Sequence, residues 1–63
     1  MQLAALLRAR IESGEFPPQS RFPSLRQLEA EYDVAPMTVR HAIRVLVDEG
    51  LLVTYPGRGT FVA

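Results

Sequence analysis

The sequence contains no cysteine and no lysine and only one histidine, and two of these shortages exclude whole classes of site. Without cysteine the chain can form neither a disulfide framework nor a thiolate metal site. One histidine cannot hold a metal ion unaided, so we expect no metal and no cofactor. No apolar run is long enough to span a bilayer, and the chain opens at Met1 without the basic and apolar blocks of a signal peptide. We therefore expect a cytoplasmic protein with no membrane segment.

The length of the chain limits it to a single unit. A chain of 63 residues with 48% hydrophobic content can bury only a modest core. We therefore interpret residues 1–63 as one domain, whose stability depends on packing alone.

The charges of the chain cancel, so composition alone gives no sign of a nucleic-acid partner. Seven arginines balance seven acidic residues, whereas DNA-binding domains are usually basic. The two signs separate along the chain, however, because acids cluster at 29–33 and 48–49 while Arg40, Arg44 and Arg58 lie in or after the third helical segment. Phosphate contacts depend on such local groups. The use of arginine alone suits two-pronged recognition of phosphate or guanine, and biased coding explains it equally well.

Apolar spacing and capping residues predict two helices in the first half of the chain. Apolar residues recur at helical spacing from Leu3 to Ile11, and Ser13 with Gly14 supplies a stop, which predicts a first helix over 3–13. Three prolines exclude helix between 17 and 23 and leave room for a very short strand at 21–22. Ser24 is a hydroxyl N-cap with Gln27 in the capping-box position, which predicts a second helix over 25–32.

A third helix is expected to begin at Pro36, after a short break at 33–35, and to end near Glu49 with Gly50 as its stop. At 100° per residue, one side of this helix is apolar and the other is polar or cationic. The apolar side carries Val39, Ala42, Ile43, Leu46 and Val47, and the opposite side carries Met37, Arg40, His41 and Arg44. Two helices joined by so short a turn form a helix-turn-helix, whose second helix enters the major groove. A merely solvated helix face is the alternative interpretation of the arginines.

The end of the chain predicts a β-hairpin. Apolar and β-branched segments at 51–54 and 60–62 flank a turn at 55–59, with Arg58 between two glycines at the tip. The expected fold class is therefore mainly α with a small β-hairpin, a winged helix-turn-helix of three helices followed by a two-stranded wing. Arg58 can reach phosphates or a narrow minor groove from the wing. A solubilising residue in an ordinary turn is the other interpretation.

Nearly the whole chain resembles the DNA-binding domain of the GntR family of bacterial transcription regulators. The segment from Leu7 to Gly14 is similar to the opening helix that ends in Ile-x-x-Gly, and Pro18 with 22–24 resembles the entry Pro-Gly-x-x-Leu-Pro-Ser. Arg26, Leu28 and Ala30 fall where the second helix of the family has them. The recognition segment of the family is similar to residues 34–40 with Ala42 and Leu46. Its wing is similar to residues 50–52 and 57–62.

The resemblance implies sequence-specific binding of double-stranded DNA and assigns contacts to matching positions. Arg26, Thr38 and Arg40 would contact the backbone or bases from the helices, and Gly57 and Arg58 from the wing. Helix geometry adds Arg44 to this set. The neighbouring Met37, His41 and Gly59 complete the expected DNA-binding residues.

Three positions depart from the family pattern. Gln19 stands where the family commonly has glycine, which puts in doubt a turn that needs positive φ. Ala35 replaces a serine or threonine and so loses a helix cap or phosphate contact worth roughly 1 kcal/mol. Pro36 cannot supply the side-chain contact that some members make there. We therefore expect the fold to persist and the affinity to be modest.

The resemblance also implies partners beyond this domain. Family members carry a C-terminal domain that binds a small-molecule effector and dimerises, and we expect the chain to be a fragment of such a longer regulator, a metabolite-responsive repressor. The full protein would be a homodimer on a palindromic operator, whereas the isolated domain would be a weakly binding monomer. The operator sequence, the effector, the target genes and the sign of regulation are not encoded in recognisable form.

Two other classes of function compete with DNA binding. A winged helix used for protein interaction would present Met37, His41 and Tyr55 as a contact patch, and the neutral net charge favours it. An enzyme with His41 as base is discounted, because one histidine on an open helix face lacks a pocket and an oriented partner. The aromatic residues are assigned to packing and not to stacking on bases, namely Phe16, Phe22, Tyr32 and Phe61.

Overall fold

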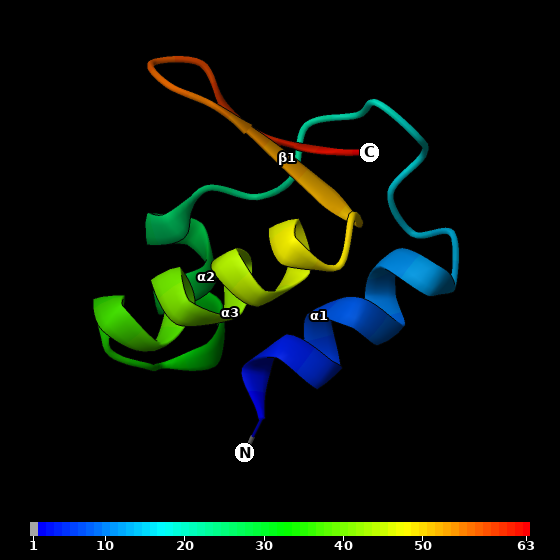
Figure 1. Ribbon diagram of the computed structural model, residues 1–63. Coiled ribbons are helices and arrows are strands. Elements are labelled where there is room, and N and C mark those ends of the chain that lie inside the picture. The colour runs from blue at the N-terminus through cyan, green and yellow to red at the C-terminus, as the bar shows by residue number, and fades with distance from the viewer. Residues whose placement is uncertain (1) are drawn as a thin grey trace.

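The computed structural model describes residues 2–63 as three helices followed by a hairpin (Figure 1). The elements in chain order are α1 (Leu3–Glu12), α2 (Leu25–Tyr32), α3 (Pro36–Asp48), β1 (Leu52–Tyr55) and β2 (Gly59–Val62). The predicted winged helix-turn-helix is confirmed, with helix boundaries within one residue of those expected. Each strand is displaced slightly: β1 begins and ends one residue later than predicted, and β2 begins one residue earlier. No helix within 2–63 is long and apolar enough to cross a membrane.

The caps around α2 set the geometry of the helix-turn-helix. The Ser24 hydroxyl accepts a hydrogen bond from the Gln27 amide at 3.1 Å, and the Gln27 side-chain carbonyl accepts one from the Ser24 amide at 2.8 Å. This is the predicted capping box. Asp33 ends the helix with a left-handed φ of 52°, so that only two residues separate it from Pro36, the first residue of α3. Ala35 provides no side-chain cap, as its substitution for serine implied.

The core lies around α3, which contacts α1, α2 and β1. Figure 1 shows α3 crossing between α1 and the hairpin, with α2 behind it. Because all three other layers pack on α3, its apolar side is buried along its length. The buried residues are Leu3, Leu7, Phe22, Leu28, Val39, Ala42, Ile43, Leu46, Leu52 and Val62.

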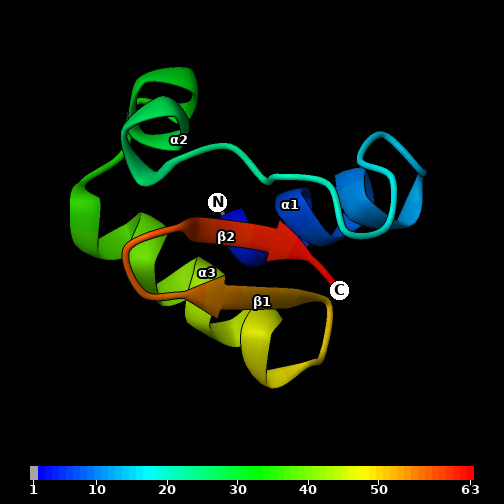
Figure 2. The ribbon, with the colours of Figure 1, turned by 90° about the horizontal axis from the view of Figure 1, so that it is seen from above.

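The wing is braced by the segment between α1 and α2, which runs beside β2 (Figure 2). The Phe22 amide donates to the Thr60 carbonyl at 2.8 Å, and the Val62 amide donates to the Ser20 carbonyl at 2.9 Å. The short strand predicted at 21–22 is thus a single bridge between Arg21 and Phe61. It makes the two-stranded hairpin locally three-stranded.

Gln19 adopts the positive φ that the turn needs, although it is not glycine. Its φ is +68°, and its amide donates to the Val62 carbonyl at 2.9 Å. For a residue other than glycine, this left-handed backbone conformation costs about 1–2 kcal/mol relative to the right-handed one. The turn survives the loss of glycine because the backbone bond to β2 holds it in place.

The aromatic residues pack in two separate places. Phe22 is buried, its ring 5.0 Å from that of Phe16, and Tyr32 packs against the same core. Phe61 instead packs edge-on against Tyr55, with 5.7 Å between ring centroids, on the face of the wing opposite to Leu52 and Val62. The packing role is confirmed, but for Phe61 it lies outside the core.

Candidate nucleic-acid interface

The polar side of α3 faces solvent, as the helical periodicity predicted. Its apolar side packs against the three other layers, so the helix presents one continuous exposed ridge. Met37, near the start of the ridge, is 70% exposed. The exposed side chains of the ridge are those of Met37, Thr38, Arg40, His41 and Arg44.

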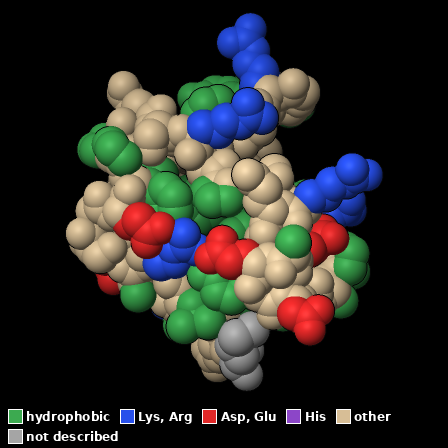
Figure 3. Space-filling model, turned by 180° about the vertical axis from the view of Figure 1, so that it is seen from behind, with side chains coloured by type: hydrophobic (Ala, Val, Ile, Leu, Met, Phe, Trp, Pro, Cys, Tyr) green, Lys and Arg blue, Asp and Glu red, His purple; other side chains and the backbone are tan. Residues whose placement is uncertain are grey.

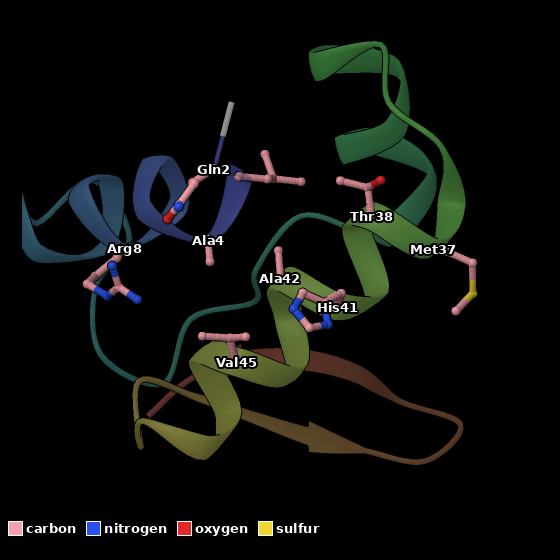
Figure 4. A pocket seen from close by; sticks show the side chains of 9 residues that line it. Gln2, Ala4, Arg8, Met37, Thr38, His41, Ala42 and Val45 are labelled. Carbon is pink, nitrogen blue, oxygen red and sulfur yellow. The ribbon is translucent and has the colours of Figure 1, made fainter.

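An open groove of about 670 Å³ lies on one side of this ridge, between α3 and the first half of α1. Figure 4 shows Gln2, which precedes α1, and Ala4 and Arg8 of α1 along one wall. The other wall is α3, where Thr38 and His41 border the groove and Met37 points outward at the end far from Arg8.

A second groove, of about 330 Å³, lies on the other side of the ridge, beneath the wing. Arg40 and Arg44 line it together with Leu25 of α2 and with Thr54 and Thr60 of the hairpin. The structure therefore divides the predicted residues of α3 between two sides of one ridge, and it joins the arginines to the wing.

The remaining predicted residues lie in α2 and at the tip of the wing. Arg26 is exposed in the first turn of α2. Gly57 and Gly59 have φ of +76° and +122°, conformations that favour glycine, and the exposed Arg58 lies between them. The Arg58 amide donates to the Tyr55 carbonyl at 2.9 Å and closes the turn.

One further arginine belongs to this surface and was not predicted to do so. The guanidinium of Arg21 lies over Gly59, so close that a Cβ at position 59 would stand 3.2 Å from Nη2. Sequence reasoning missed this residue because it lies in the loop between α1 and α2, and only the pairing of that loop with β2 brings it to the wing.

Two arginines on α1 are neutralised by acids. Arg8 makes a two-pronged contact with Glu49, at 2.8 and 2.6 Å. Arg10 contacts Glu15, Glu31 at 2.7 Å and the Tyr32 hydroxyl at 2.9 Å. These hydrogen bonds raise the pKa of Arg8 and of Arg10. They hold the pKa of Glu15 and of Glu49 below the ordinary value of 4.5.

The other five arginines make no ion pair and donate no side-chain hydrogen bond to any residue within 2–63. Figure 3 shows the contrast on one face: one basic side chain lies between acidic groups, while others project outward at the top and right. The neutral net charge thus conceals a division into paired and unpaired cations. The unpaired arginines are Arg21, Arg26, Arg40, Arg44 and Arg58, which we call the open arginine set.

The geometry gives little support to the two other functions considered from the sequence, protein interaction and enzyme catalysis. Tyr55 borders a hollow on the outer face of the wing, whereas Met37 and His41 border the groove beside α1, so the three share no single pocket. In the part of the chain that the structure describes, the His41 side chain makes no hydrogen bond, and no three acidic or histidine side chains gather as a metal site would require.

Comparison with known proteins identifies the family of the chain. The family model for bacterial regulatory proteins of the gntR family matches residues 1–62. The chain is 42% identical over 62 residues to the transcriptional repressor NagR of Bacillus subtilis, covering 98% of this chain and 26% of NagR. It is 48% identical over 54 residues to the histidine utilization repressor of Klebsiella aerogenes, covering 86% of this chain and 22% of that protein.

A solved structure extends the likeness to three dimensions. The DNA-binding domain of AraR, crystallised in complex with operator ORR3, superposes with a TM-score of 0.93 at 35% identity. The match covers 98% of this chain and 75% of that one. The chain spans about a quarter of the length of the two curated repressors it matches.

Proposed function

Because the chain belongs to the GntR family of bacterial regulatory proteins, we propose that it reads operator DNA with α3 in the major groove and the wing on the adjacent backbone or minor groove. The family and the relatives are DNA-binding transcription regulators and not enzymes. The observation that carries the proposal for this chain is the open arginine set, which joins α2, α3 and the wing and has no acidic partner among the described residues 2–63.

Each α3 residue has chemistry that suits a part of the duplex. The Thr38 hydroxyl donates a hydrogen bond to a phosphate, and Arg40 makes a two-pronged contact with a phosphate or with guanine O6 and N7. Arg44 and Arg26 extend the contact to neighbouring phosphates.

The first turn of α3 offers apolar contact in place of hydrogen bonds. Ala35, Pro36 and Met37 are all exposed there, and none has a side-chain donor. Because the N-terminal residues of a recognition helix reach the base edges, Met37 is suited to the thymine methyl group in the major groove. His41, one turn further on, and the wing residues Gly57, Arg58 and Gly59 complete the interface.

The proposal extends to the regulator of which this domain would be the reading head. NagR and the histidine utilization repressor are named as repressors, and we assign repression to this chain by analogy. The two heads of a homodimer would occupy a palindromic operator in the bacterial cytoplasm, with a small-molecule effector bound by a further domain. The isolated head would be a monomer of modest affinity, because linking two heads raises their effective concentration.

An NMR titration with a short random-sequence duplex at two salt concentrations tests DNA binding. We expect shifts at Arg26, from Thr38 to Arg44 and from Gly57 to Gly59 that fade at higher salt, because binding releases counterions from the phosphates. The amides of α1 near Arg10 are the internal control and stay in place. A duplex that moves no resonance even at low salt would contradict the proposal and favour a protein partner.

A further inference from the structure

Arg21 is held beside the wing by the backbone on both sides of it. The Val62 amide donates to the Ser20 carbonyl at 2.9 Å, and the Phe22 amide donates to the Thr60 carbonyl at 2.8 Å. These two bonds fix the register in which Arg21 stands opposite Phe61 of β2. The start of the side chain is therefore placed by the fold and not by a flexible loop.

The missing side chain of Gly59 makes room for the guanidinium. A Cβ at position 59 would lie 3.2 Å from Nη2 and 3.3 Å from Nε of Arg21, closer than ordinary van der Waals contact. Tyr55 stands directly opposite Gly59 in the hairpin, and Arg58 is the next residue along the turn. Arg21 thus extends along the wing to its tip, where a second unpaired arginine already lies.

Nothing in the described chain compensates this charge. Arg21 is exposed and takes part in no ion pair within residues 2–63, in contrast to Arg8, which Glu49 neutralises at 2.6 Å. Two like charges at the end of one hairpin repel each other, and a polyanion that spans both relieves that repulsion.

We propose that Arg21 is a second phosphate-binding residue of the wing, carried by the loop between α1 and α2 and seated on Gly59. The proposal rests on the proposed DNA-binding function and adds a residue to its interface. Arg58 contacts the duplex from the tip, and Arg21 binds the sugar-phosphate backbone beside it. The contact is to phosphate and is independent of base sequence.

The test measures the affinity of the chain for a duplex of about 20 base pairs at several salt concentrations by fluorescence anisotropy. For Arg21→Gln we expect binding to weaken roughly five- to ten-fold at low salt. The slope of log K against log salt should fall by about 0.9, the value for one phosphate contact. Arg21→Lys keeps the charge and should keep the slope. Arg10→Gln removes the same charge from a residue already neutralised and is the matched control.

The outcomes separate the inference from its premise. Wild-type affinity and slope in Arg21→Gln would overturn it, while DNA binding by the wild type would stand. Weaker binding with an unchanged slope, together with altered amide shifts throughout the wing, would make Arg21 a structural brace and would also overturn the phosphate contact. If the wild type itself fails to bind the duplex at low salt, the proposed function and this inference fail together.

Discussion

Arg10 and Arg40 carry the same charge, and the chain surrounds them in opposite ways. The Arg10 side chain is only 24% exposed, lies 5.1 Å from the centroid of the Phe16 ring and contacts Glu31 and Tyr32. Arg40 is exposed beside an apolar groove, and no acid within 2–63 pairs with it. Arg10 links α1 to α2 and to the loop between them, so its charge serves folding. Arg40 has no such partner, and its charge is left for a ligand.

This difference explains how a domain with no net charge can bind a polyanion. Three acids pair with the two neutralised arginines, and no acid within 2–63 pairs with the open arginine set. Long-range attraction depends on net charge and is therefore weak, whereas short-range contact depends on local charge and is strong. The affinity should consequently depend on where an arginine is removed more than on how many are removed.

The largest effect is expected from removing two arginines of α3. In Arg40→Gln/Arg44→Gln we expect duplex binding to weaken about 100-fold, because two charge-assisted contacts to the duplex are lost. The free energy of unfolding should change by less than about 0.5 kcal/mol, as for surface residues without partners. Anisotropy and urea denaturation measure the two quantities. A large loss of stability with unchanged binding would mean that Arg40 and Arg44 serve folding and not DNA binding.

Removing Arg10 should produce the converse result. In Arg10→Gln we expect the free energy of unfolding to fall by about 1–2 kcal/mol, because two partly exposed ion pairs and the contact with Phe16 are lost together. Duplex affinity should stay within about two-fold of wild type, since no phosphate contact is removed. Urea denaturation checks the first expectation, with Glu31→Gln as the control that breaks one pair only. A loss of duplex affinity as large as that of Arg40→Gln/Arg44→Gln would show that the paired arginines also serve DNA binding.

Most of the fold could be predicted from local sequence. The capping box at Ser24, the proline at the start of α3 and the glycines of the hairpin act within a few residues, so the sequence contains the whole signal. The strain at Gln19 was also visible, because a residue other than glycine at a turn that needs positive φ is a local conflict. The structure shows that the turn is kept and that Gln19 adopts φ of +68°.

The division of the arginines could not be predicted, because it depends on distant partners. Glu49 lies 41 residues from Arg8, and Glu31 lies 21 residues from Arg10. Helical periodicity shows that Arg40 points away from the core, but it does not show whether an acid from another element forms an ion pair with it. Arg21 was missed for the same reason, since the pairing of its loop with β2 closes over a long stretch of chain.

A smaller effect should distinguish apolar contact from charge within the interface. Replacing thymine by deoxyuracil removes one methyl group from the major groove and leaves every phosphate in place. At the position that Met37 contacts we expect about four-fold weaker binding, the value of one buried methyl group. Met37→Ala should abolish this sensitivity while it retains the salt dependence. Equal binding of the thymine and deoxyuracil duplexes at every position would refute the contact.

The smallest effect concerns the paired side of the molecule and its dependence on pH. The hydrogen bond from Arg8 holds the pKa of Glu49 below 4.5, so this carboxylate contributes stability above its unfolded pKa and loses it as the pH falls through the folded value. We expect wild type to melt at a higher temperature than Glu49→Gln at neutral pH, and the difference to shrink as the pH falls below 4.5. Asp48→Asn, which removes a neighbouring carboxylate that takes part in no ion pair within 2–63, is the matched control for the loss of one negative charge. A difference that persists in acid would mean that packing and not charge joins Arg8 to Glu49, and the contrast between paired and open arginines would then rest on Arg10 alone.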